Sequence, residues 1–381
     1  MSAQSEGVLA IGSGPFLISL AEAWLESGWS KMTLFVTNPL LTDTEELKKL
    51  REQAHQGSSE ASLAILNGAG DEEVDWEAVV RPFPFILYVS QHGDWEELRN
   101  VQTACIAAKK PMIPATGLRG MGIAGPWLNP DGEGRWESAW RRVHTSVFPR
   151  EGETEALSGT AAAILSNLLV YEWKKAYTGN REPHSKNQCY ILDPATLTGS
   201  WHPILPHPLV SGYDKAREVT HLELELADDR EPVKKEEWFT AFGRLTSKVS
   251  GIFHMWEEGE LNQLPLAQCL VQPADPLSKG PAGLLPAVVC SGLTHEEARR
   301  ESGLAGLEAY VHRLSPLFVT GTPYSTGRKP ALERDARPPK RSDGAACLFK
   351  PKAGPADSSP RGGCHTYGIQ PNRRYPPPLL S

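Results

Sequence analysis

The residues best suited to chemistry lie near the start of the chain, where an apolar run from Val8 to Ile11 meets Gly12-Ser13-Gly14 and then Pro15. Gly12 permits a tight turn, and Gly14 lets the backbone approach a phosphate. The N-terminus of the helix that follows offers N–H groups to an anion. Leu17 stands where the third glycine of a dinucleotide-binding fingerprint would fall. The pattern fits two interpretations: nucleotide binding at Gly12, Ser13 and Gly14, or a β-α-β unit that serves only the fold.

Other polar residues follow the apolar runs that would form neighbouring strands. Thr37-Asn38 stands where a dinucleotide or ATP site would place an acidic residue for the ribose hydroxyls. His92, after the run 85–90, is a candidate catalytic base or an ordinary loop residue. Asp94 is better explained as the N-cap of a helix.

Alternating apolar and amphipathic segments must position these residues. Strands are expected at 8–11, 32–36, 62–66, 85–90 and 111–115, and helices at 15–26, 42–56, 71–80, 94–110 and 155–177. Thr42 and Glu45 have the spacing of a capping box for the second helix, and Gly179 would end the last one. Strands and helices in this order predict an α/β fold with a doubly wound, mostly parallel Rossmann-type sheet.

Composition excludes some classes of partner and site. The net charge of -7 argues against a general nucleic-acid binder, because phosphate neutralisation requires a basic surface. The six cysteines are scattered, so we expect reduced thiols in a cytoplasmic protein and no zinc site. We expect no signal peptide, because no charged-then-apolar leader opens the sequence, and no membrane span, because no apolar run approaches about 18 residues.

The order of the motifs over residues 7–210 resembles the ThiF-like, ubiquitin-activating type of fold. The likeness rests on the Gly-x-Gly opening, on NVQTACIAAKKPMIPATGLRGMGIAGP, on the long helix ending at Thr178-Gly179 and on QCYILDPATLTGSWHPILPHP. That family adenylates carboxyl termini, and many members hold zinc with two Cys-x-x-Cys pairs. Here Arg135 to Trp140 stands in place of the first pair, and no acidic ribose or magnesium ligand is evident. The resemblance implies a binding scaffold in which nucleotide activation is lost.

A second region follows Gly212. Residues 219–226 alternate like a half-buried strand, 233–245 fit a helix, and 250–256 fit a strand. Thr294 and Glu297 form a capping box for a helix that runs to Leu314. This region resembles the opening of a YcaO domain, in which the Gly292-Leu293-Thr294 turn precedes a helix with an ATP- and magnesium-binding face. The alignment puts Glu308 on a family glutamate and Ala305 on the other, with Glu301 on the same helix face. Glu301 and Glu308 are therefore the candidate ligands for ATP and Mg²⁺, or simply part of a solvated face.

The two resemblances divide the chain into three parts: a ThiF-like domain at 1–212, an incomplete YcaO-like domain at 213–319 and a tail at 320–381. The tail is rich in Pro, Arg, Gly and Ser and is expected to be disordered, as after a frameshift or truncation within the YcaO part. A ThiF-like part followed by YcaO resembles the fused cyclodehydratases of thiazole/oxazole-modified bacteriocin maturation. The resemblance implies a precursor peptide, bound through its leader, as the partner, and ATP with Mg²⁺ as the family cofactors. It also suggests a flavin dehydrogenase, a separate leader-binding protein or a homodimer as further partners.

Whether this chain is itself an enzyme stays open, because most of the YcaO ATP site is absent and catalytic residues cannot be assigned. The leading hypothesis is a precursor-peptide-binding scaffold of an ATP-dependent cyclodehydratase that is inactive alone. One alternative is an active adenylating ThiF-like enzyme that uses Gly12 to Leu17 for ATP. Another is an NAD(P)-dependent oxidoreductase, which the missing third glycine and the missing acidic ribose ligand disfavour.

Overall fold

A computed structural model describes residues 7–29, 31–57, 62–68, 74–129, 131, 134–149, 157–179, 183–213 and 235–320. The strand expected at 219–226 and the tail from 321 onward lie outside this set, as does the beginning of the helix expected at 71–80. In the described part of the chain, no helix combines the length and apolar character that crossing a membrane requires.

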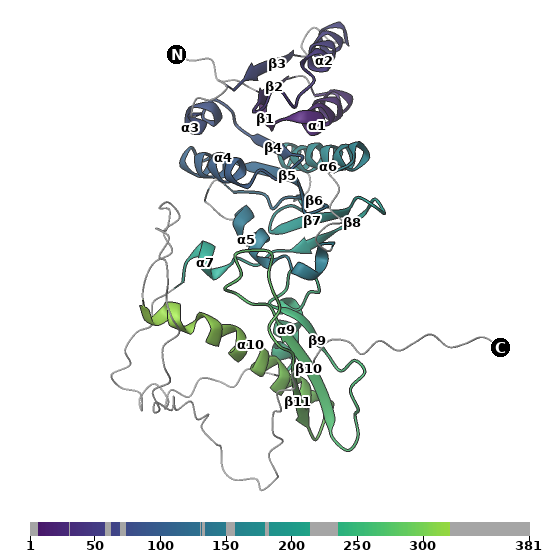
Figure 1. Ribbon diagram of the computed structural model, residues 1–381, viewed down its shortest axis with the longest axis vertical. Helices are drawn as coiled ribbons and strands as arrows, with labels where there is room; N and C mark the ends of the chain where they lie inside the picture. Colours follow the sequence, from purple (N-terminus) through teal and green to yellow (C-terminus); the bar gives the residue numbers. More distant parts are fainter. Residues whose placement is uncertain are drawn as a thin grey trace, which may run out of the picture.

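An eight-stranded mixed sheet forms the upper part of the molecule in Figure 1. Its spatial order is β3-β2-β1-β4-β5-β6-β7-β8; the first five strands are parallel, and each of the last three pairs antiparallel with its neighbour. The strands are β1 (Val8–Gly12), β2 (Lys31–Val36), β3 (Ser62–Asn67), β4 (Ile86–Ser90), β5 (Met112–Leu118), β6 (Met121–Ala124), β7 (Gln188–Asp193) and β8 (Thr198–Pro203). The α/β prediction is confirmed, and the three antiparallel strands β6, β7 and β8 qualify the expectation of a mostly parallel sheet.

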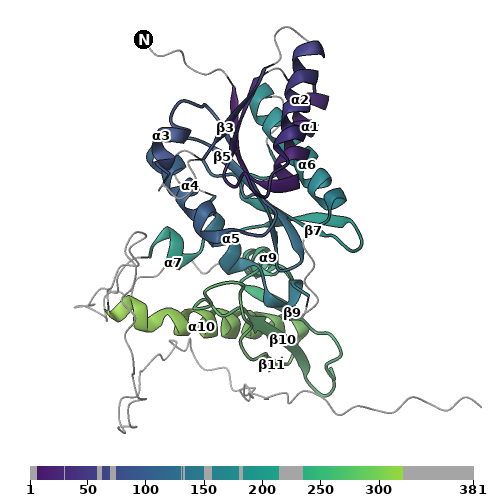
Figure 2. The same ribbon diagram turned by 45° about the horizontal axis from the view of Figure 1, so that its top comes forward.

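Helices cover both faces of this sheet (Figures 1 and 2). One face is covered by α1 (Gly14–Glu26), α2 (Thr44–Gly57) and α6 (Gly159–Thr178), and the other by α3 (Trp76–Val80), α4 (Trp95–Ala107) and α5 (Trp136–Arg142). Leu17 is fully buried in the first of these two cores, against α6 residues such as Leu165. A leucine at the position of the third fingerprint glycine therefore contributes apolar packing instead of a close helix–strand approach.

A smaller unit lies below the sheet in both views. It contains α9 (Lys235–Leu245) and a three-stranded antiparallel sheet in the order β11 (Val288–Gly292), β10 (Ala267–Pro273) and β9 (Phe253–Glu257). The long helix α10 (His295–Thr320) packs across it. The capping prediction at its start is confirmed, because the Thr294 hydroxyl accepts from the Glu297 N–H at 3.1 Å and the Glu297 carboxylate accepts from the Leu293 N–H.

Two short segments lie where the two units meet: a 3-10 helix, η1 (Thr145–Val147), whose Thr145 N–H donates to the Ala282 carbonyl, and the helix α7 (Pro208–Ser211). Arg142 at the end of α5 is nearly buried and donates to Tyr310 of α10 at 2.9 Å and to the carbonyl oxygens of Leu205 and Pro206. His144 continues the contact, because its backbone N–H donates to the Val249 carbonyl. The sheet and the smaller unit are thus joined by buried hydrogen bonds as well as by apolar packing.

Candidate functional site

The candidate site lies at the carboxyl ends of β1, β2 and β4, where open α/β sheets bind ligands. Gly12 ends β1 beside β4: a Cβ on Gly12 would stand 2.2 Å from the Val89 carbonyl oxygen. Gly14 begins α1 with φ +71°, and the nearest atoms to its would-be Cβ are the Leu41 carbonyl oxygen at 3.5 Å and the Gln91 side chain at 3.6 Å. Gly12 is therefore required by strand packing, and Gly14 by its left-handed backbone.

The loop between β2 and α2 folds back onto this glycine turn. The Gly14 N–H donates to the Thr42 hydroxyl oxygen at 2.8 Å, and the Thr42 hydroxyl donates to the Asn38 carbonyl at 2.9 Å. Thr42 is 5% exposed. The prediction that Thr42 caps α2 is wrong: the Asp43 carboxylate accepts from the N–H groups of Glu45 and Glu46 instead. The Thr42 hydroxyl is engaged by a glycine 28 positions earlier, a contact that local spacing cannot show.

The other predicted residues at the strand ends have structural partners. The Asn38 side-chain oxygen accepts from the Leu40 N–H, so it shapes the loop. The Gln91 side chain donates to the Leu157 carbonyl at 2.9 Å, which ties the β4 end to the start of α6. Asp94 caps α4 by accepting from the Glu97 N–H, as predicted. His92 is exposed in the same loop.

Glu97 is a polar residue at this edge that the sequence does not single out. Its carboxylate accepts from the hydroxyl of the fully buried Tyr88 at 2.9 Å and is hydrogen-bonded by the Thr37 side chain. Burial raises the pKa of the Glu97 carboxyl, and burial together with the Glu97 charge raises the pKa of Tyr88 well above its usual value. A carboxyl group from α4 thus reaches the end of β2, where the sequence itself carries Thr37-Asn38. In sequence, Glu97 is simply an acid in the first turn of a helix.

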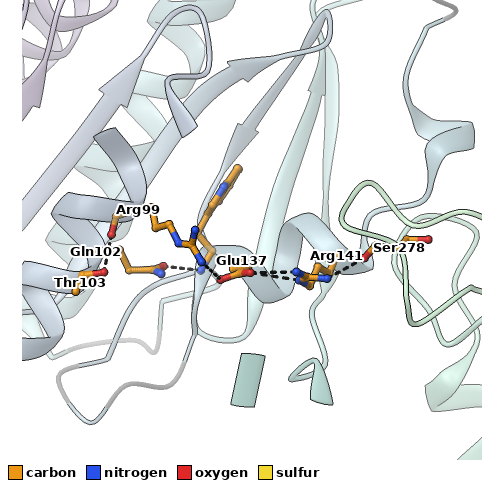
Figure 3. Close-up of polar contacts among 7 residues, drawn as sticks. Arg99, Gln102, Thr103, Glu137, Arg141 and Ser278 are labelled. Atoms are coloured by element: carbon orange, nitrogen blue, oxygen red, sulfur yellow. Dashed lines mark hydrogen bonds and ion pairs between the residues drawn. The ribbon is translucent and has the colours of Figure 1, made fainter. Parts of the chain in front are cut away.

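The stretch Arg135 to Trp140, where a zinc-binding cysteine pair would stand, forms helix α5. Figure 3 shows that Glu137 lies between Arg99 of α4 and Arg141, with Nη2–Oε1 at 3.3 Å to Arg141, and that Arg141 donates to the Ser278 carbonyl at 2.9 Å. Gln102 accepts from the Trp136 N–H in the same view. This helix fastens the sheet to the smaller unit.

Potential metal ligands do not gather in the described ranges, where no group of three or more His, Cys, Asp or Glu side chains has the geometry to hold a metal ion. Cys105, Cys189, Cys269 and Cys290 are buried and are not joined in disulfides. Burial raises the pKa of Cys105 and of Cys189 to about 12, so these two thiols stay protonated and inert. Cys347 and Cys364 lie beyond residue 320, outside the description.

The second pair of predicted ligands lies on α10. The Glu301 carboxylate is half-buried and accepts from the neighbouring Arg300 guanidinium at 2.7 Å and 3.2 Å. Glu308 lies two turns further along and is exposed, with Ala305 between them. Glu301 and Glu308 therefore lie on one helix, and the Glu301 carboxylate is already paired with the Arg300 guanidinium. This helix belongs to the smaller unit and lies away from the glycine turn at the end of β1 (Figure 1).

The surroundings of Gly12 and Gly14 predict different losses of stability when each glycine is replaced by alanine. Gly12→Ala is expected to lower the free energy of unfolding by about 3 kcal/mol, because the added Cβ meets backbone that cannot rotate away. Gly14→Ala meets nothing closer than 3.5 Å, so only its left-handed conformation opposes the change, at about 1–2 kcal/mol. Urea denaturation of both variants measures the difference; equal losses would contradict the assignment of Gly12 to strand packing.

Comparison with known proteins gives only distant likenesses. No protein-family model and no curated protein matches the chain. Among solved structures, E. coli MccB has a TM-score of 0.43 and 14% identity, over 57% of this chain and 68% of that one. E. coli MccB with AMPCPP and selenomethionine MccA has a TM-score of 0.43 and 14% identity, over 55% of this chain and 66% of that one. Selenomethionine PaaA has a TM-score of 0.39 and 15% identity, over 53% of this chain and 64% of that one. The chain spans about two thirds of the length of each, and likenesses at these TM-scores carry no argument about what it does.

Proposed function

We propose that this chain is a precursor-peptide-binding scaffold in the maturation of a ribosomal, thiazole/oxazole-modified bacteriocin, and that it does not activate nucleotides at its glycine turn. The first support is the order of the ThiF-like and YcaO-like motifs in the sequence. The observation that carries the second half of the proposal is the buried hydrogen bond from the Gly14 N–H to Thr42.

That hydrogen bond matters because a phosphate is held at a helix N-terminus by unpaired backbone N–H groups. The Gly14 N–H is engaged by a threonine hydroxyl from the β2–α2 loop. The next residue, Pro15, has no N–H to offer. The Leu41 carbonyl oxygen, which carries partial negative charge, lies close to Gly14. The N–H of Gly14 is therefore already used, Pro15 has none, and the Leu41 carbonyl oxygen would repel a phosphate oxygen. These three features disfavour a bound phosphate at the turn.

Under this proposal the smaller unit is the start of the YcaO-like domain, and ATP with Mg²⁺ would be contacted at Glu301 and Glu308. Carboxylate oxygens are suitable magnesium ligands, but a pair on one helix supplies only part of an octahedral set, and Arg300 competes for one member. The isolated chain is accordingly expected to bind ATP-Mg weakly and to form no azoline ring.

The second candidate function is an ATP-dependent adenylating ThiF-like enzyme. One observation favours it: Glu97 brings a carboxylate to the end of β2, beside Thr37, where an acidic group would hold ribose hydroxyls. The carboxylate is engaged by Tyr88 and Thr37, and the neighbouring phosphate position is closed by Thr42. The scaffold proposal therefore accounts for more of the hydrogen bonds at this edge of the sheet than the adenylating enzyme does.

Calorimetric titration with ATP-Mg, together with ATP–pyrophosphate exchange in the presence of candidate peptides, separates the two functions. The scaffold predicts no exchange, and any weak ATP-Mg heat should be reduced about tenfold or more by E301Q/E308Q and be unchanged in Gly14→Ala. Exchange that disappears in Gly14→Ala and in Glu97→Gln, with both variants folded by circular dichroism, would overturn the scaffold in favour of the adenylating enzyme.

A further inference from the structure

Strand β8 is one of the two edges of the eight-stranded sheet. Among the strands that the structure describes it pairs only with β7, and its residues Thr198 to Ser200 are exposed. In Figure 2 the turn of the hairpin that begins with β7 projects away from the helices that cover the sheet. An edge strand presents a row of main-chain N–H and C=O groups to a further strand, and most proteins block such edges. The only proline in β8 is Pro203, at its end, so most of this edge is unprotected.

The register shows which groups face outward. The Ile204 N–H donates to the Asn187 carbonyl at 2.8 Å, which makes these two residues a hydrogen-bonded antiparallel pair. Pairs alternate along the ladder, so His202 and Ser200 bond to β7, whereas Pro203, Trp201 and Gly199 turn their main-chain groups outward. The Pro203 carbonyl confirms this direction, because it accepts from the Ser250 hydroxyl across the edge at 2.8 Å. Within the described ranges, no hydrogen bond from beyond the sheet reaches the main chain of Gly199 or Trp201.

An aromatic surface lies beside these outward groups. The Trp201 ring contacts Tyr190 edge-on at 5.4 Å between centroids and stacks on His184 at 5.7 Å. Gly199 leaves room for the Tyr190 ring, which would lie 2.6 Å from a Cβ at that position. Trp201 is half-buried and the His184 side chain is 57% exposed. Aromatic rings of this kind supply contact area to a bound chain at low entropic cost.

The charges along the edge select the polarity of the occupant. Lys248, two residues before Ser250, is exposed near the Pro203 end. At the Thr198 end the charged residue is Asp193, whose carboxylate accepts from the Ala195 N–H. The edge is therefore positive at one end, and a strand with an acidic residue at that end complements it.

We infer that β8 binds an extended polypeptide segment by strand addition, with peptide main-chain groups on Gly199 and Trp201, an apolar side chain on Tyr190 and Trp201, and an acidic residue near Lys248. This inference rests on the proposed peptide-binding function and gives it a location. Main-chain hydrogen bonds supply affinity in this binding mode, and pockets for alternate side chains supply specificity.

The test compares two substitutions of one residue. Peptides of about 15 residues selected on the full chain from a randomised library serve as probes, because a strand of about five to six residues fits within that length. Trp201→Ala and Trp201→Pro both remove the indole, but only the proline removes the outward N–H, and β7 pairing does not need that N–H. We expect Trp201→Pro to bind about tenfold more weakly than Trp201→Ala by fluorescence anisotropy, and an Asp-to-Asn change in the peptide to weaken binding further.

A peptide-side measurement keeps the inference falsifiable if the proline variant does not fold. N-methylation at alternate peptide residues removes the N–H donors from one edge of the added strand. Methylation on the edge that pairs with β8 should therefore abolish binding to the wild-type chain, and methylation on the other edge should leave the affinity within about twofold. Equal affinities for the two Trp201 variants, or for the two methylated sets, would overturn the β8 location while leaving the proposed function intact. Failure to select any peptide on the wild-type chain would instead overturn the proposed function and the location together.

Discussion

Replacing Glu172 by alanine is expected to lower the free energy of unfolding by about 3–5 kcal/mol, because it leaves a buried ammonium group without its carboxylate. Glu172 lies on α6 and is 1% exposed. Its Oε1 accepts from the Lys175 ammonium at 2.8 Å, and its Oε2 accepts from the N–H and the hydroxyl of Ser185 at 2.8 Å and 3.0 Å. The Lys175 side chain is 7% exposed, and its ammonium group also lies 2.7 Å from His184 Nδ1 and over the face of Tyr171. The change therefore removes three hydrogen bonds from groups that water does not reach.

The measurement is urea denaturation of Glu172→Ala beside two further variants. Replacing both members of the pair, as E172L/K175M, should recover most of the loss, because no charge is then left buried. Glu77→Ala breaks an exposed pair with Arg81 and should change stability little. A loss in Glu172→Ala no larger than that in Glu77→Ala would contradict the assignment of this cluster as a buried support of α6 and the β7 hairpin.

The Glu172 cluster also shows which kind of information the sequence lacks. Glu172-x-x-Lys175 has the spacing of an ordinary surface pair on a helix, and nothing nearby marks it as buried. It becomes buried because the turn before β7 folds over the end of α6 and supplies Ser185. The helix itself was predictable: its apolar residues recur at helical spacing, and Gly179 ends it in the left-handed conformation with φ +64°.

The same division applies to the candidate site. The unit β1-α1-β2 follows from an apolar run, a glycine turn and a second apolar run, all of which are local features. What decides the chemistry of the turn is the Thr42 hydroxyl, whose spacing to Glu45 predicted a helix cap while its actual partner is Gly14. Glu97 is similar, because its place at the end of β2 depends on how α4 packs beside Tyr88. Local patterns thus predicted the elements, whereas contacts between elements determine which polar groups remain free to bind.

Antiparallel strands β6 to β8 make this point for the fold. The sequence of the glycine-rich passage from Gly117 fits a loop as well as a strand in close backbone contact. In the structure it contains the end of β5 and the whole of β6, and a Cβ at Gly117 would lie 2.5 Å from the Gln91 carbonyl oxygen. The stretch that begins at Gln188 forms a hairpin whose turn is held by the Asp193 carboxylate. Its outer strand is the edge to which we assign peptide binding.

A second large effect is expected from acid, through His207 at the joint between the two units. His207 is 1% exposed, its Nδ1 accepts from the Leu209 N–H at 3.2 Å, and its backbone N–H donates to Ser138. Burial, with the positive charges of Arg142 and Arg141, lowers the pKa of the His207 imidazole to about 3. Protonation would place a third positive charge beside two guanidinium groups and would convert the accepting nitrogen into a donor that faces another donor.

The sign of the pH dependence follows from the unfolded chain, in which a histidine has a pKa near 6.5. Below about pH 6.5 the unfolded state takes up a proton at His207 that the folded state does not, so stability falls as the pH falls. The loss amounts to about 1.4 kcal/mol per pH unit and ends near pH 3, for a total of about 4–5 kcal/mol. Burial also lowers the pKa of His144 in the same joint, which adds to the effect in the same direction.

His207→Asn tests this assignment, since an asparagine can still accept from the Leu209 N–H as a helix cap but has no proton to take up. Between pH 6.5 and 4, the slope of unfolding free energy against pH should fall by about one proton relative to the wild type. An unchanged slope in His207→Asn would mean that acid opens the molecule elsewhere. A reduced slope would identify His207, at the contact of α5 with α7, as a group whose protonation weakens the joint between the eight-stranded sheet and the smaller unit, since Arg142 donates to the carbonyl oxygens of the two residues that immediately precede His207.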